Sequence, residues 1–126
     1  MTGPIVLAAG GTGGHMFPAQ ALAEELMARG CEVALVTDAR GAAFADVPTH
    51  RVRAGRIGGG LVGKVVGAAE LLMGTVQAGA LLKRLGAAAV IGFGGYPSVP
   101  PLMAASRLGL PTVIHEQNAL LGRANR

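Results

Sequence analysis

A glycine-rich segment near the amino terminus, GGTGGH at residues 10–15, carries the residue types that bind phosphate. Glycines let backbone N–H groups face a ligand, and a helix that starts just after them directs the positive end of its dipole at an anion. A tight turn from strand to helix needs only one or two glycines. The four glycines around Thr12 therefore favour a phosphate or pyrophosphate site over a purely structural turn.

Other nucleotide-binding patterns fit this segment less well. Counted from Gly11, the dinucleotide pattern G-x-G-x-x-G needs a small residue at position 16, where Met16 stands. Asp38 follows the next apolar run and is the acid that such a fold offers to a ribose, so NAD binding stays open as an alternative. The sequence has neither a Walker A lysine after these glycines nor a G-x-S-x-G nucleophile motif.

His15 ends the glycine-rich segment, at the start of a predicted helix. The positive end of the helix dipole disfavours the imidazolium form, so a neutral ring is expected there. A neutral imidazole can accept a proton near pH 7, which makes His15 a candidate general base. Contact with a phosphate, or a structural hydrogen bond to a backbone carbonyl, are the alternatives.

Two further segments follow predicted strands in the same way. In GFGGY, which ends at Tyr96, Gly94 and Gly95 would open space beside the first segment, while Tyr96 offers a hydroxyl or packs in the core. HEQN begins at His115 and brings polar side chains, including Glu116, to a strand end, for sugar recognition or for a buried hydrogen-bond network. The carboxyl ends of parallel strands share one edge of a sheet, where ligands bind at the switch point of strand order.

The apolar pattern supplies the elements that would position these segments. It predicts strands at residues 5–9, 32–37, 51–53, 88–91 and 112–115, a first helix at 17–29, one long helix or two at 61–84, and a helix at 98–108. Pro18 suits the first turn of the first helix and Gly30 suits its exit. Strands that alternate with helices predict an α/β fold, a Rossmann-like parallel sheet with helices on both faces.

Composition narrows the class of protein. The 126 residues suffice for one domain with a buried core, and 51% apolar against 14% charged residues argues against disorder. Three Phe and one Tyr are too few for a base-stacking platform, so nucleic acid is not an expected partner. The single cysteine, Cys31, indicates a reducing compartment, and the amino terminus does not resemble a signal peptide.

Charge and apolar residues are distributed unevenly along the chain. Residues 47–115 hold a single acid, Glu70, against seven basic residues, Arg51, Arg53, Arg56, Lys64, Lys83, Arg84 and Arg107. This bias favours an anionic partner. We expect no membrane-spanning helix. The predicted helix at 61–84 has an apolar stripe that is either its core face or a patch for an anionic membrane surface, namely Leu61, Val62, Val65, Val66, Ala69, Leu72, Met73 and Val76.

Three stretches together resemble the bacterial cell-wall members of glycosyltransferase family 28. They are GGTGGH with the following FPAQALAEEL, then GFGGYPSVPPLMAA, then PTVIHEQNALLGRAN. The resemblance covers nearly the whole chain, and HEQN followed by Gly122 and Asn125 is its most specific part. It implies the GT-B architecture, in which two Rossmann-like domains face each other across a cleft.

The resemblance also implies an activity. The family transfers N-acetylglucosamine, with inversion, from UDP-N-acetylglucosamine to the 4-hydroxyl of undecaprenyl-pyrophosphoryl-N-acetylmuramyl-pentapeptide in peptidoglycan synthesis, without a metal or redox cofactor. By position, Thr12, Gly13 and Gly14 would contact phosphate or sugar groups, His15 would be the base, and Asn118 would touch the donor sugar.

Residues 1–126 would then form the amino-terminal, acceptor-binding domain of a peripheral enzyme on the cytoplasmic face of the plasma membrane. A second domain, not contained in this sequence, would hold most of the uridine-nucleotide site, so this chain alone is expected to be inactive. The alternative is a non-catalytic membrane-docking or acceptor-binding subunit that works with a separately encoded catalytic partner.

Overall fold

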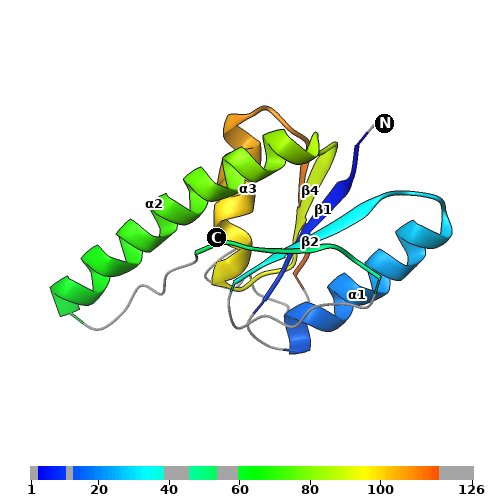
Figure 1. Cartoon of the computed structure of the whole chain (residues 1–126). Helices are drawn as coiled ribbons and strands as arrows, with labels where there is room; N and C mark the ends of the chain where they lie inside the picture. Colours follow the sequence, from blue (N-terminus) through cyan, green and yellow to red (C-terminus); the bar gives the residue numbers. More distant parts are fainter. Residues whose placement is uncertain (1–2, 11–12, 39–45, 54–59, 117–126) are drawn as a thin grey trace.

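A five-stranded parallel sheet organises the chain (Figure 1). The computed structural model describes residues 3–10, 13–38, 46–53 and 60–116. The strand order is β3-β2-β1-β4-β5, and the strands are β1 Ile5–Ala8, β2 Val33–Thr37, β3 Thr49–Arg51, β4 Ala89–Gly92 and β5 Thr112–Ile114. Every neighbouring pair is parallel. The expected Rossmann-like α/β fold is confirmed.

The central strands form because their residues can be buried on both faces of the sheet. Leu7 at the centre of β1 pairs with Leu35 on one side and Ile91 on the other, and all of β2 is buried. Parallel strands in this position appear in a sequence as continuous apolar runs, which is why they were predictable. The edge strand β3 is half-polar and lies two residues before its predicted position of 51–53.

Helices cover both faces of the sheet (Figure 1). The helix α1, Gly13–Ala28, covers one face, where Leu7, Leu35 and Phe93 form a core cluster with its buried residues. The helices α2, Gly60–Leu85, and α3, Val99–Arg107, cover the other face over a second cluster that contains Val6, Val36 and Val90. A short 3-10 helix, η1 at Tyr96–Ser98, leads into α3.

The helix α1 begins four residues earlier than predicted, at Gly13 instead of residue 17. Pro18 therefore lies inside the helix, in its second turn. The fixed φ of proline is compatible with a helix. Because Pro18 has no backbone N–H, the helix lacks one hydrogen bond, the one to the carbonyl of Gly14. As a result the last residues of GGTGGH belong to the first turn of α1, not to a loop.

The helix α2 is one continuous helix of 26 residues, and the structure distinguishes between the two interpretations of its apolar stripe, a core face or a surface patch. The predicted apolar stripe is exposed: Leu61 is 79%, Leu72 62% and Val76 67% exposed. The buried residues lie on the opposite side of the helix, and most of them are small: Gly67, Gly74, Thr75, Ala78, Leu81 and Leu82. The amino-terminal half of α2 extends past the other elements (Figure 1).

By length and composition α2 could cross a membrane, contrary to the expectation from the sequence. Its carboxyl-terminal half does not behave as a lipid-embedded segment, because Ala78, Leu81 and Leu82 belong to the core cluster that covers the sheet. About a third of its most apolar window is buried inside the domain. We therefore describe α2 as a helix of this domain with an exposed apolar face.

Small residues on α2 allow its close approach to the rest of the domain. A Cβ atom at Gly74 would collide with the backbone carbonyl of Arg53, which follows β3. The same junction is held by a 2.9 Å hydrogen bond from the Arg53 N–H to the Gln77 side chain. By contrast, a Cβ at Gly79 would meet only the Cβ of Ala104, at 3.8 Å.

We expect Gly74→Ala to destabilise the chain by about 1–3 kcal/mol, because the carbonyl of Arg53 is backbone and cannot turn aside. Gly79→Ala is the matched control in the same helix. It should stabilise the chain by up to about 1 kcal/mol through helix propensity. Urea denaturation of both variants measures the difference, and equal effects at the two positions would contradict this account of the packing.

Candidate functional site

The switch point of strand order lies between β1 and β4. From β1 the chain builds β2 and β3 on one side, then crosses to build β4 and β5 on the other. Just past the strand ends, the Phe93 N–H donates to the Ala8 carbonyl at 2.9 Å, and the Ala9 N–H donates to the Val36 carbonyl at 3.1 Å. The segments that follow β1 and β4 are therefore neighbours at the edge where Rossmann-like domains bind ligands.

Gly10 is the tightest point of this edge. It is buried, and a Cβ atom there would lie 2.6 Å from Cγ of Pro97 and 2.8 Å from Oγ1 of Thr37. Only glycine fits between the turn after β4 and the end of β2. Close packing therefore explains why position 10 of the GGTGGH segment is glycine. The other glycines of the segment are explained either by backbone conformation or by contact with a ligand.

The amino terminus of α1 follows directly. Gly13, Gly14 and His15 form its first turn, which contains no acidic residue, so no carboxylate of that turn opposes the positive end of the helix dipole. Thr12 lies outside the described residues, and so does the side chain of His15. The arrangement suits an anion, since the first N–H groups of an α-helix have no acceptor within the helix itself.

The turn after β4 is well defined by its backbone. Gly94 and Gly95 have φ values of +93° and +78°, in the left-handed region that favours glycine. The backbone N–H and the hydroxyl of Ser98 both donate to the Gly95 carbonyl, at 3.1 and 2.8 Å. Tyr96 begins η1, and its side chain lies outside the described part of the structure. The turn conformation is thus sufficient to account for both glycines.

The third predicted segment lies beside the second. The His115 N–H donates to the Gly92 carbonyl at 2.8 Å, and the ring of His115 packs against Phe93 with centroids 5.4 Å apart. His115 and Glu116 are half-buried. Asn118 lies outside the described residues. The three segments therefore follow β1, β4 and β5 at one edge of the sheet, as predicted, and the structure shows that these three strands are adjacent.

Asp38 does not support the NAD alternative. It is 5% exposed, and its backbone carbonyl accepts a 2.6 Å hydrogen bond from the Arg51 guanidinium. A carboxylate that is to bind a ribose has to reach the ligand crevice. The end of β2 holds a residue that sequence reasoning missed, namely Thr37, which is fully buried beside Gly10. A hydroxyl that ends an otherwise apolar strand was the available signal.

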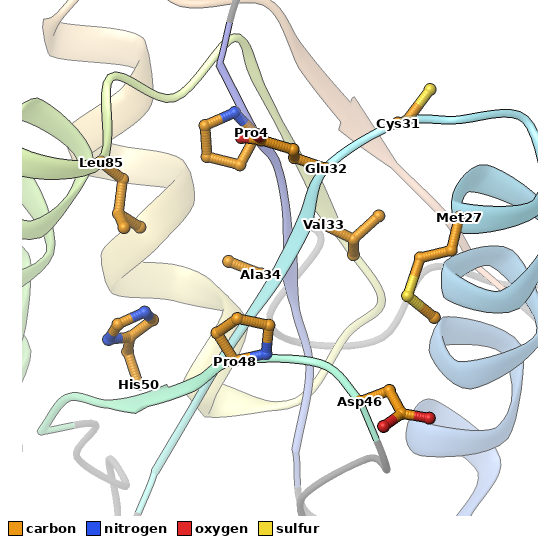
Figure 2. Close-up of a pocket in the computed structure, with 10 residues that line it drawn as sticks. All are labelled: Pro4, Met27, Cys31, Glu32, Val33, Ala34, Asp46, Pro48, His50 and Leu85. Atoms are coloured by element: carbon orange, nitrogen blue, oxygen red, sulfur yellow. The ribbon is translucent and has the colours of Figure 1, made fainter.

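A cavity of about 380 Å³ lies at the other edge of the sheet, near the amino ends of β1 and β2 (Figure 2). Its side chains do not converge on one point. Met27 and Cys31 lie on one side of β2, and His50 and Leu85 lie on the other (Figure 2). Its lining is mostly apolar. We therefore assign the candidate site to the carboxyl edge, where the glycine segments are.

The fold and this edge define a Rossmann-like domain whose first helix begins at the switch point of the sheet. Residues 5–126 match the profile of the glycosyltransferase family 28 N-terminal domain. The chain therefore belongs to glycosyltransferase family 28.

Curated relatives and a solved structure agree with this assignment. The chain is 62% identical over 127 residues to a Rhodospirillum centenum protein and 55% identical over 127 residues to one from Rhodospirillum rubrum. Both are named UDP-N-acetylglucosamine--N-acetylmuramyl-(pentapeptide) pyrophosphoryl-undecaprenol N-acetylglucosamine transferase. The matches cover 98% and 97% of this chain but 34% and 33% of the relatives, so the chain spans about a third of their length.

The crystal structure of Acinetobacter baumannii MurG is similar, with a TM-score of 0.79 and 36% sequence identity over 96% of this chain and 37% of that chain. This agreement supports the fold of the described elements and their order in the sheet.

Proposed function

We propose that this chain is the acceptor-binding half of an inverting glycosyltransferase. The complete reaction moves N-acetylglucosamine from UDP-N-acetylglucosamine to undecaprenyl-pyrophosphoryl-N-acetylmuramyl-pentapeptide in peptidoglycan synthesis. The observation that carries the proposal is the glycine segment at the switch point, where α1 begins without an acidic residue in its first turn. The names of the relatives supply the substrate classes.

In this proposal the pyrophosphate of the acceptor lies at the amino terminus of α1. The backbone N–H groups of Thr12, Gly13 and Gly14 would face its oxygens, where the helix dipole stabilises negative charge. His15 would accept the proton of the attacking sugar hydroxyl. The bond between that oxygen and the anomeric carbon forms as the bond from this carbon to UDP breaks, and UDP leaves with its negative charge.

The remaining predicted site residues would contact the sugars. Asn118 would touch the donor sugar, and Glu116, Gly94, Gly95 and Tyr96 would line the space beside the glycine segment. No step of this reaction calls for a metal ion or a redox cofactor, since the helix amino terminus supplies the positive charge for the phosphates.

A second domain would hold most of the uridine-nucleotide site. The relatives are about three times as long as this chain, which leaves room for such a domain in them. The partners of residues 1–126 would then be the lipid-linked acceptor, UDP-N-acetylglucosamine across the cleft, and the second domain itself.

The chain by itself is therefore expected to bind the acceptor without turning it over. Binding of a detergent-solubilised lipid acceptor is measured by calorimetry, and product formation with UDP-N-acetylglucosamine is followed by chromatography. A lipid-linked sugar without the pyrophosphate is the control ligand, and it should bind at least about tenfold more weakly, as expected for the loss of one charge-assisted contact. Robust transfer by this chain would contradict the two-domain proposal, and equal binding of both lipids would contradict the phosphate site.

The exposed face of α2 supports a peripheral location on the cytoplasmic face of the plasma membrane. Large apolar side chains cover this face, and Lys83 and Arg84 lie near its end. An amphipathic surface with basic residues lies in the interface of an anionic membrane and does not span it. The same face supports the second candidate function, a membrane-docking subunit with a separate catalytic partner.

A further inference from the structure

Ser98 occupies the N-cap position of α3 but does not cap this helix. A serine at an N-cap usually accepts a hydrogen bond from the backbone N–H two or three residues later. In α3 those residues are Pro100 and Pro101, which have no N–H, and the Ser98 side chain makes no capping bond. Ser98 is 0% exposed. A fully buried hydroxyl that cannot cap its helix needs another physical reason.

The hydroxyl of Ser98 instead fixes the turn that follows β4. It donates to the Gly95 carbonyl at 2.8 Å, and the backbone N–H of Ser98 donates to the same carbonyl at 3.1 Å. Gly94 and Gly95 both have positive φ values in this turn. Glycine has more conformations open to it than any other residue, so two bonds to one carbonyl restrict the turn where its own residues do not.

The turn places Pro97 against the backbone that leads out of β1. A Cβ atom built at Gly10 would lie 2.6 Å from Cγ and 2.9 Å from Cβ of Pro97, so the two residues are in close contact. Pro97 is fully buried, and in a close-packed interior a shift of its ring would leave a void beside Gly10. Gly10 stands three residues before Gly13, where α1 begins. The turn after β4 therefore constrains the path of the chain from β1 toward α1.

We propose that Ser98 is a positioning residue for the acceptor phosphate, whose hydroxyl holds the Gly95 turn so that Pro97 keeps the approach to α1 in the conformation that binds the anion. The inference rests on the proposed function, in which the pyrophosphate of the acceptor lies at the amino terminus of α1. Ser98 does not touch the ligand. It raises the fraction of chains with the competent backbone, and the apparent affinity falls in proportion when that fraction falls.

Two substitutions test the two links of this inference. Ser98→Ala removes the hydroxyl and keeps the backbone bond to Gly95, whereas Pro97→Ala keeps both bonds and removes the ring that faces Gly10. Inorganic pyrophosphate is the probe in calorimetric titrations of this chain. Each variant should bind it about three- to tenfold more weakly than the parent, the range that one lost hydrogen bond allows. The double variant should bind no more weakly than the weaker single variant, since both changes act through one contact.

The matched control is Thr75→Val. Thr75 is also buried, and its hydroxyl donates to the Leu71 carbonyl at 2.7 Å within α2. Ser98→Ala and Thr75→Val each remove one bond from a buried hydroxyl to a backbone carbonyl, so both should lower the urea midpoint of unfolding by similar amounts. Only Ser98→Ala should weaken pyrophosphate binding. Circular dichroism checks the folding of each variant, and Pro97→Ala decides the test if Ser98→Ala does not fold.

Unchanged pyrophosphate affinity in Ser98→Ala would overturn the inference, because the hydroxyl would then serve stability alone. Equal weakening in Thr75→Val would overturn it as well, since a general loss of stability would account for both results. Additive losses in the double variant would show that Ser98 does not act through Pro97. A parent chain that does not bind pyrophosphate would instead contradict the proposed phosphate site, and the inference would fall with it.

Discussion

Replacing His15 by alanine is expected to lower kcat for N-acetylglucosamine transfer by about 10²- to 10⁴-fold, the usual contribution of a general base. The first turn of α1 contains His15, and because the positive end of a helix dipole disfavours an imidazolium, we expect its ring to accept a proton there. The acceptor KM should change little, since the backbone N–H groups that face the pyrophosphate are retained.

The test needs a chain with both domains, such as residues 1–126 joined to the remainder of the Rhodospirillum centenum relative. His50→Ala is the matched control, because His50 lines the cavity at the other edge of the sheet and should leave kcat unchanged. A variant that keeps its kcat but shows a raised acceptor KM would assign His15 to phosphate contact, and the base assignment would be wrong.

The positions of the central strands were predictable because burial on both faces determines which residues they contain, whereas their order in the sheet came from the structure. Apart from Thr37 at the end of β2 and Gly92 at the end of β4, these strands are unbroken apolar runs, as is typical of strands buried on both faces. Once these strands alternate with helices, the three polar or glycine-rich segments must meet at one edge. That part of the candidate site followed from the sequence, and the strand pairing confirms it.

The packing of α2 could not be predicted in the same way. Hydrophobicity ranks Leu and Val above Gly and Ala, so the periodic row of large residues fitted a core face as well as it fitted a membrane-surface patch. The structure buries the small residues instead, because Gly74 lets the helix contact the backbone of Arg53 directly. The close approach of α2 to the backbone after β3 depends on contacts between segments far apart in the sequence, and the periodicity of one helix does not reveal such contacts.

Thr37 and Gly10 show a similar limit at the site itself. The sequence presents four glycines as one phosphate-binding signal, but the structure explains Gly10 by its contacts with Pro97 and Thr37. Gly94 and Gly95 likewise have the positive φ values that their turn requires. Glycines at these positions therefore do not by themselves indicate a ligand, and the amino terminus of α1 is the stronger indication of a phosphate site.

The exposed face of α2 leads to the second large expected effect. Leu72→Gln combined with Val76→Gln should weaken binding of this chain to phosphatidylglycerol vesicles by about 10²-fold. Each apolar side chain that leaves water contributes about 1.5–3 kcal/mol, and tenfold in affinity corresponds to about 1.4 kcal/mol. Both residues are more than 60% exposed, so the substitutions should leave the fold intact, and glutamine retains good helix propensity. Vesicle co-sedimentation measures the binding, and circular dichroism checks the fold.

Phe17→Gln is the control that tests whether vesicle binding needs the exposed face of α2 or any exposed apolar side chain. Phe17 is 72% exposed on α1, which covers the opposite face of the sheet, so its loss should leave vesicle binding unchanged. High salt distinguishes electrostatic attraction to the membrane from burial of apolar side chains. At 1 M ionic strength the Debye length is about 3 Å, so the attraction of Lys64, Lys83 and Arg84 to anionic lipids is screened, whereas apolar burial is not. The parent should therefore keep part of its binding in high salt, and the double variant should lose nearly all of it. Equal loss in Phe17→Gln, or full binding by the double variant, would show that the outer face of α2 does not dock on the membrane.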